Sequence, residues 1–208
     1  MDVQTLITAF FTLFVVIDPI GLAPLFVALT AGATRDHRRS VAVRAVLIAF
    51  GILLAFGFFG EAVLGFAGIS MAAFRIAGGA LLFLTALDML FERRTKRRGE
   101  QAHREEENDN DPSVFPLATP LIAGPGAIAS LILLVGQSGS ALETAAIFGV
   151  LVAVLVLVLV FFLLGGLLEK AIGETGINVV TRLLGMLLAA LSVQFVIDGV
   201  RDIGLMAG

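Results

Sequence analysis

The sequence predicts an all-α integral membrane protein in which six transmembrane helices form two inverted three-helix repeats, with broken first and fourth helices. Three observations lead to this fold class. The composition is 58% hydrophobic and 15% charged, with a mean hydropathy of +1.01, which is too apolar for a soluble domain. One sequence pattern occurs twice along the chain, and the basic residues gather in alternate loops.

Six apolar segments are long enough to cross a bilayer, which takes about 20 helical residues. We place them at residues 5–29, 41–64, 69–91, 114–136, 144–168 and 177–200. They divide the chain into a first membrane repeat (1–91), a charged linker (92–113) and a second membrane repeat (114–208). The linker is typical of a flexible connection, although its Arg and Lys residues also suit contacts with anionic lipid headgroups.

A duplicated pattern relates the two repeats. The residues that recur in the same order at nearly the same spacing include Glu61, Gly68 and Arg75, matched by Glu169, Gly176 and Arg182. Because each repeat holds an odd number of spans, the two copies face opposite sides of the membrane. Many secondary transporters are built in this way.

The basic residues set the expected orientation. They gather in the loop after the first span, in the linker and in the loop after the fifth span: Arg35, Arg38, Arg39, Arg44, Arg93, Arg94, Lys96, Arg97, Arg98, Arg104 and Lys170. These loops share one side of a six-span chain, whereas Arg201 lies on the other. By the positive-inside rule the basic side is cytoplasmic, so we expect both termini outside the cytoplasm.

The first span carries a carboxylate near its middle. Asp18 directly precedes Pro19, and Gly21 and Pro24 follow in the same segment. A proline lacks the backbone N–H and disfavours a helical conformation of the residue before it, so the helix is expected to break at Asp18. Two interpretations of Asp18 stay open: a cap for the new half-helix, or a group that binds a solute, a coupling proton or a sodium ion.

The fourth span is interrupted at the equivalent place by Gly124-Pro125-Gly126. Glycine lets another backbone or a solute come close, and the first amides of the new half-helix suit an anionic group. We expect the two breaks to meet at the membrane midplane. The predicted substrate-binding residues are Asp18, Pro19, Gly21, Pro24, Gly124, Pro125, Gly126 and Ala127.

Four charged residues lie within the predicted spans as two sets. Glu61 and Arg75 flank Gly68, and Glu169 and Arg182 flank the equivalent glycine, so a tight hairpin brings each set to a similar depth. We predict a structural ion pair within each repeat. The alternatives are arginines that extend to the interface and gating pairs that exchange partners.

Catalytic and cofactor chemistry has little support in the sequence. Cysteine is absent, and the two histidines, His37 and His103, fall in predicted cytoplasmic loops. The segment Gly136-Gln137-Ser138-Gly139 matches an intramembrane serine protease motif only weakly and has no histidine to activate the serine. We expect no enzymatic activity, no cofactor, no metal and no nucleic-acid partner.

The residues at both breaks resemble the MarC family of bacterial inner-membrane proteins. The similar segments are 16–26 in the first span, 120–127 in the fourth and 181–185 in the sixth, and the similarity covers essentially the whole chain. The resemblance implies a six-span protein of the bacterial inner membrane. For some members it also implies transport of small neutral amino acids, but it implies no established binding residues.

The leading functional hypothesis is a secondary transporter that moves a small solute by alternating access at a midplane site. A channel for small solutes or ions, lined by the same breaks, and a non-transporting membrane protein are the alternatives. The expected partners are a small solute such as a neutral amino acid, a coupling proton or sodium ion, and the lipid bilayer. The sequence predicts no particular oligomeric state.

Overall fold

The computed structural model describes residues 3–93 and 111–204, apart from the side chains of Glu169 and Glu174. Most of the predicted linker, residues 94–110, lies outside the described part. The described helices are α1 (Val3–Ile17), α2 (Pro19–Leu29), α3 (Arg35–Phe66), α4 (Met71–Leu90), the π-helical η1 (Ser113–Ile122), α6 (Pro125–Gly136) and α7 (Ala141–Asp202).

The helices lie where the sequence predicts spans. Five segments are long and apolar enough to cross a bilayer: Val3–Leu29, Arg35–Phe66, Met71–Leu90, Ala141–Leu168 and Thr175–Asp202. A sixth crossing results if η1 and α6, which are bent by 54° at a short break, count as one span. The all-helical membrane class is therefore confirmed.

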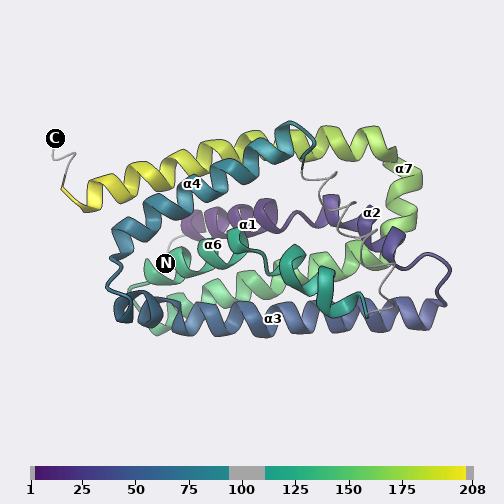
Figure 1. The fold of residues 1–208 in the computed structure, drawn as a ribbon, viewed down its shortest axis with the longest axis horizontal. Coiled ribbons are helices and arrows are strands. Elements are labelled where there is room, and N and C mark those ends of the chain that lie inside the picture. Colours follow the sequence, from purple (N-terminus) through teal and green to yellow (C-terminus); the bar gives the residue numbers. More distant parts are fainter. Residues whose placement is uncertain (1–2, 94–110, 205–208) are drawn as a thin grey trace.

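The spans run side by side along the long axis of the molecule (Figure 1). Both termini lie at one end of this bundle, and α7 reverses direction at the other end. The reversal occurs at Gly173, whose φ of 70° and ψ of 168° interrupt the helix. This backbone conformation is essentially restricted to glycine, which explains why the chain turns at this residue.

Hydroxyl side chains fix where three of the long helices begin. Thr34, Ser70 and Ser140 are the N-caps of α3, α4 and α7, and each side-chain oxygen accepts a hydrogen bond from the amide three residues later. A Ser or Thr cap satisfies one of the amides that has no acceptor within its own helix. The helix starts are thus encoded locally.

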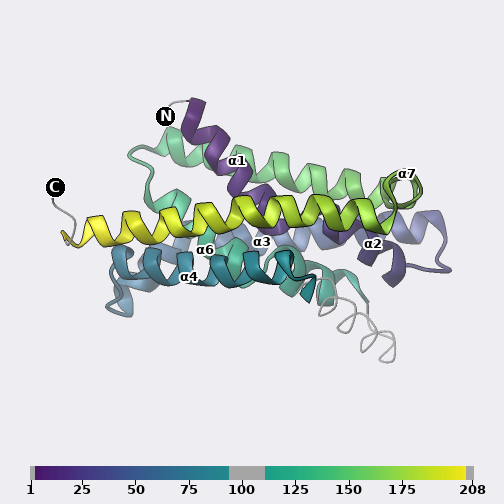
Figure 2. The same ribbon diagram turned by 90° about the horizontal axis from the view of Figure 1, so that it is seen from above.

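Glycines allow the closest contact between α4 and the second half of α7, which lie against each other in both views (Figure 2). A Cβ atom on Gly79 of α4 would lie 2.7 Å from the Ser192 carbonyl oxygen. A Cβ atom on Gly185 of α7 would lie 3.3 Å from the Ala86 carbonyl oxygen. Small residues are typical of membrane helix interfaces, because helices in lipid associate through close packing and not through the hydrophobic effect.

The broken first span packs on the first half of α7. A Cβ atom on Gly165 would lie 3.2 Å from the Ala23 carbonyl oxygen of α2. Next to this contact the rings of Phe26 and Phe162 stack with centroids 4.4 Å apart, and both side chains are buried. By contrast, Phe59 is 67% exposed on α3, as expected for a side chain that faces lipid.

We predict that Gly79→Ala destabilises the folded protein by about 1–3 kcal/mol, because the added methyl group meets backbone atoms that cannot move away. Gly51→Ala in α3 is the matched control, since a Cβ atom there has nothing within 4 Å. It should be neutral or stabilise by up to about 1 kcal/mol. Thermal unfolding in detergent measures both effects, and equal unfolding temperatures for the two variants would contradict the close contact.

Candidate functional site

The first helix break is centred on Asp18, which is 1% exposed. Its backbone is left-handed, with φ 60° and ψ 63°, and its carboxylate accepts a hydrogen bond of 3.0 Å from the Gly21 amide. Pro19 follows as the first residue of α2, so the Val15 carbonyl loses the amide that would bond it in a continuous helix. The structure therefore has the capping geometry that the sequence suggested.

Gly21 is required by this cap. A Cβ atom at residue 21 would overlap the carboxylate of Asp18. The predicted site residue Gly21 therefore serves to let the carboxylate fold back over the start of α2. Pro24 lies inside α2 and removes a second helical hydrogen bond, that to the Ile20 carbonyl.

The second break separates η1 from α6. Phe115 and Thr119 have extended backbones inside η1, and each precedes a proline, which disfavours the helical conformation of the residue before it. Gly124 caps α6 with φ −82° and ψ 167° but has no side chain to bond the first amides. The Gly126 and Ala127 amides of the first turn consequently have no acceptor within their own helix.

The two breaks adjoin in the interior of the bundle. A Cβ atom on Gly126 would lie 3.2 Å from Val16 Cγ1 of α1 and 3.4 Å from Leu82 of α4. Val16 is two residues before Asp18, so the end of α1 lies against the start of α6. Both Asp18 and Ala127 are buried, and the site combines a carboxylate with the positive end of a helix dipole.

Buried hydroxyls beside the breaks were not recognised in the sequence. Thr12 on α1 and Ser130 on α6 are both 0% exposed, and neither side-chain oxygen has a hydrogen-bond partner among the described residues. Each lies one helical turn from the contact between Val16 and Gly126. The sequence does contain a signal for them: each is a hydroxyl residue in an apolar segment, four residues from Val16 or Gly126 and hence on the same helix face.

The predicted Glu61–Arg75 ion pair is wrong, because Arg75 bonds a carboxylate at the end of α7, whereas the Glu169–Arg182 pair stays a prediction. Arg75 Nη1 of α4 lies 2.5 Å from Asp202 Oδ2 at the end of α7, instead of pairing with Glu61. Arg182 Nη2 of α7 lies 2.7 Å from Glu92 Oε1 just after α4. Glu61 makes no ion pair with the described residues, and the side chain of Glu169 lies outside them.

The antiparallel packing of α4 and the second half of α7 explains these partners. Each helix begins where the other ends, so an arginine near the start of one meets a carboxylate near the end of the other. The two pairs therefore stand at opposite ends of one interface. The Arg75 side chain is 12% exposed and the Arg182 side chain 52%, whereas their partners Asp202 and Glu92 are 44% and 37% exposed, so the two pairs differ in the burial of the arginine.

The described end of the linker is tied to α3. Asp111 forms an ion pair with Arg44 and accepts a hydrogen bond of 3.0 Å from the Ser113 amide. Burial raises the pKa of Asp111, but the hydrogen bonds from Ser113 and Arg44 outweigh it and hold the pKa below its ordinary value. The carboxylate is therefore charged at neutral pH and links the start of η1 to α3.

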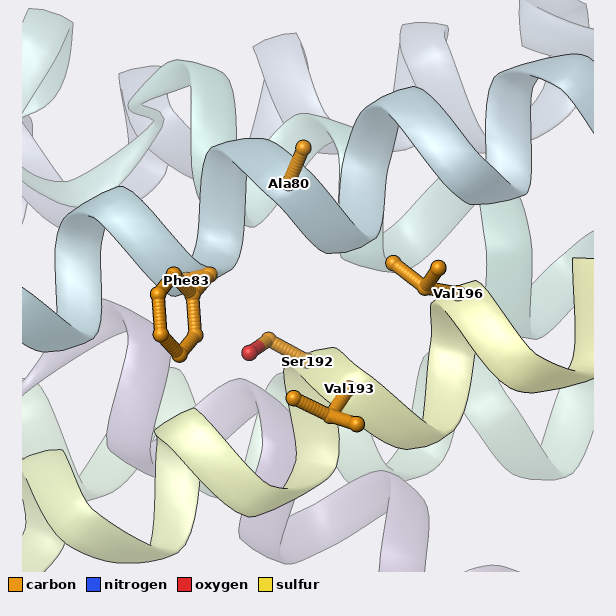
Figure 3. Close-up of a pocket in the computed structure, with 5 residues that line it drawn as sticks. All are labelled: Ala80, Phe83, Ser192, Val193 and Val196. Atoms are coloured by element: carbon orange, nitrogen blue, oxygen red, sulfur yellow. The ribbon is translucent and has the colours of Figure 1, made fainter.

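Two grooves open on the outside of the bundle. One, of about 240 Å³, lies between α4 and α7 and is lined by Ala80, Phe83, Ser192, Val193 and Val196 (Figure 3). The other, of about 510 Å³, lies between α1 and α7 and is lined by Ile7, Thr8, Phe11, Val15, Leu187, Ala190, Leu191 and Gln194. Both are mainly apolar and include none of the predicted substrate-binding residues. Among the described residues, no cluster of three or more His, Asp or Glu could hold a metal ion.

Helices of this length, with polar groups buried at interior breaks, define a multi-pass integral membrane protein. Residues 3–204 match the family model described as MarC family integral membrane protein. The chain belongs to the MarC family.

Similar proteins come from archaea and bacteria. UPF0056 membrane protein MJ1677 of Methanocaldococcus jannaschii is 38% identical over 97% of this chain and 98% of that protein. UPF0056 membrane protein YvbG of Bacillus subtilis is 36% identical over 94% of each chain. UPF0056 membrane protein YhcE of Escherichia coli is 34% identical over 93% of this chain and 91% of that protein. No solved structure matches the chain.

We predict that Arg75 couples energetically to Asp202 and not to Glu61. Asp202→Ala leaves the mostly buried guanidinium of Arg75 unpaired, and Arg75→Ala removes the ion pair of the more exposed Asp202, so each variant should unfold at a lower temperature and Asp202→Ala by the larger margin. In the double variant Arg75→Ala/Asp202→Ala the losses should be less than additive, by about 0.5–3 kcal/mol. Glu61→Ala combined with Arg75→Ala is the control cycle. Non-additivity in that control cycle, and additivity with Asp202, would restore the pairing expected from the sequence.

Proposed function

We propose that this protein is a secondary transporter of small solutes whose binding site lies between the two helix breaks. The observation that carries the proposal is the contact of Val16 with Gly126, which joins two interrupted helices in the buried interior. Interrupted helices within a membrane are tolerated where protein or a polar cavity satisfies their free backbone groups. In secondary transporters such sites bind the substrate.

The chemistry of the breaks favours a zwitterion. The carboxylate of Asp18 attracts an ammonium group, and the Gly126 and Ala127 amides at the start of α6 attract a carboxylate. The Asp18 carboxylate and the Pro120 carbonyl lie close beside Gly21 and Gly124, so only a compact molecule suits this site. A small neutral amino acid such as glycine, alanine or serine has this combination of charge and size. Alternatively, Asp18 binds the coupling proton or sodium ion, and the solute occupies the remaining space.

Alternating access requires two halves that move against each other, and we infer that these are the inverted repeats. Contacts between the halves support this: α1 and α2 of the first half pack on α7, and η1 and α6 of the second half pack on α3. Gly165 of α7 lies against α2, and Gly57 of α3 lies against Phe148 of α7 and Leu131 of α6. Gly57 precedes Glu61 by the same spacing that separates Gly165 from Glu169, so the two glycines hold equivalent positions in the duplicated pattern.

The exchanged ion pairs support the same internal symmetry. Arg75 and Arg182 are equivalent in the duplicated pattern; Arg75 bonds Asp202 of the second repeat, and Arg182 bonds Glu92, the linker residue that follows α4 of the first repeat. A two-fold axis in the membrane plane would interchange these pairs. One pair would then close the outer end of the interface and the other pair the inner end.

The proposed location is the cytoplasmic membrane, the inner membrane in a bacterium, with both termini outside. The start of α3 supports this orientation, because this segment carries Arg35, Arg38, Arg39 and Arg44 and lies at the end of the bundle opposite both termini (Figure 1).

For this orientation we predict that a single cysteine at Ser140 is labelled from outside intact cells and one at His37 is not. Both residues are exposed, and the chain has no native cysteine to give background. A membrane-impermeant maleimide supplies the measurement, and labelling of His37→Cys after lysis shows that the site is reactive. Labelling of His37→Cys in intact cells, without labelling of Ser140→Cys, would invert the orientation.

The transport function is tested by uptake of radiolabelled glycine, alanine and serine into proteoliposomes under a proton or sodium gradient. We predict saturable uptake by the wild-type chain and its loss in Asp18→Asn. The amide keeps the oxygen that accepts the Gly21 amide hydrogen bond but removes the charge, so the variant should still fold.

Asp36→Asn, an identical change at an exposed carboxylate in the first turn of α3, is the control and should transport normally. Uptake that rises linearly with concentration would indicate a channel instead of a carrier. Normal uptake by a well-folded Asp18→Asn variant would limit Asp18 to its capping role.

A further inference from the structure

Several hydroxyl groups of the described residues are satisfied by backbone carbonyls of the same or the preceding helical turn. The side-chain oxygen of each donates to a carbonyl three or four residues earlier in Thr8, Thr30, Thr85, Ser138, Thr144 and Ser192. Four buried hydroxyls depart from this pattern and have no partner among the described residues: those of Ser113 and Thr181, and those of Thr12 and Ser130, which alone of the four lie on the two helices that meet at the breaks, α1 and α6. A buried, unsatisfied polar group costs about 1–3 kcal/mol, so we expect water or a bound molecule to form hydrogen bonds with the hydroxyls of Thr12 and Ser130.

The two hydroxyls lie at the same level on adjacent helices. Val16 of α1 contacts Gly126 of α6; the two helices are antiparallel, and both extend from the breaks toward the end of the bundle that holds the termini (Figures 1 and 2). Thr12 precedes Val16 by four residues and Ser130 follows Gly126 by four residues. Residues four apart share a helix face, so both side chains are on the facing sides of α1 and α6, one turn from the contact.

This pair lies between the breaks and the end of the bundle that holds both termini. A third hydroxyl is close by, since Thr85 Oγ1 of α4 lies 3.8 Å from the Cβ position of Gly126. The Gly126 and Ala127 amides are one turn deeper. A solute that reached the breaks from the side of the termini along this route would therefore meet the hydroxyl pair first.

We propose that Thr12 and Ser130 line a hydrated site that binds an uncharged, hydrogen-bonding group of the transported solute. The assignment to a solute rests on the proposed transport function. A hydroxyl both donates and accepts a hydrogen bond, and neither side chain carries charge. The site therefore favours a neutral polar group, and water takes its place when the solute is absent.

The first test compares stability with transport in Thr12→Val and Ser130→Ala, which keep the side-chain shape and remove the hydroxyl. If the hydroxyls face a hydrated site, both variants should unfold at the wild-type temperature or higher and should raise the KM for uptake of the amino-acid panel about 2- to 10-fold. If the hydroxyls only bond neighbouring backbone, both variants should unfold at a lower temperature and keep the wild-type KM. That second outcome would overturn the proposal.

The second test needs no transport. In proteoliposomes, Ser130→Cys should react with the water-soluble reagent 2-aminoethyl methanethiosulfonate faster than Leu131→Cys, which is its neighbour on α6 and is equally buried. Equal, negligible rates would overturn the hydrated site. Faster labelling of Ser130→Cys in a protein that takes up no amino acid would leave the hydrated site standing and refute the transport function alone. Amino-acid uptake without a difference in labelling between Ser130→Cys and Leu131→Cys would support the transport function and overturn the hydrated site.

Discussion

Every backbone amide and carbonyl inside a bilayer must find its hydrogen-bond partner within the protein, and the architecture of this chain depends on how two exceptions are accommodated. The interruptions at Asp18 and Gly124 release backbone groups that a continuous helix would have bonded. Lipid cannot satisfy them, so both interruptions are enclosed by the longer helices α3, α4 and α7. These three helices thus surround the interrupted spans at the level of the two breaks.

The two interruptions are accommodated in opposite ways. At Asp18 the chain provides its own acceptor, and Gly21 leaves space for the carboxylate to turn back over the helix start. At Gly124 the cap has no side chain, and the amides of Gly126 and Ala127 receive nothing from it. At the first break a side chain of the chain itself bonds a free amide, whereas at the second break the free amides depend on neighbouring groups for their acceptors. This asymmetry distinguishes two positions that the duplicated pattern would otherwise make equivalent.

The spans and their breaks were predictable because the signals are local. A long apolar segment predicts a membrane helix from its composition alone, and Pro19 and Pro125 interrupt a helix wherever they occur. The partners of Arg75 and Arg182 were not predictable in this way, because they depend on the register between α4 and α7. Thr12 and Ser130 were missed for a related reason: without the contact of Val16 with Gly126, nothing in the sequence indicates that these two hydroxyls share a level.

The reversal of α7 at Gly173 has a mechanical consequence. The fifth and sixth spans meet at Gly173, the one residue between them with a non-helical backbone, and no longer loop connects them. The fifth span holds α2 through Gly165, and the sixth holds α4 through Gly185. A tilt of the fifth span beside the first break must therefore be accommodated either at Gly173, where the backbone has the greatest freedom, or along the contact of the sixth span with α4.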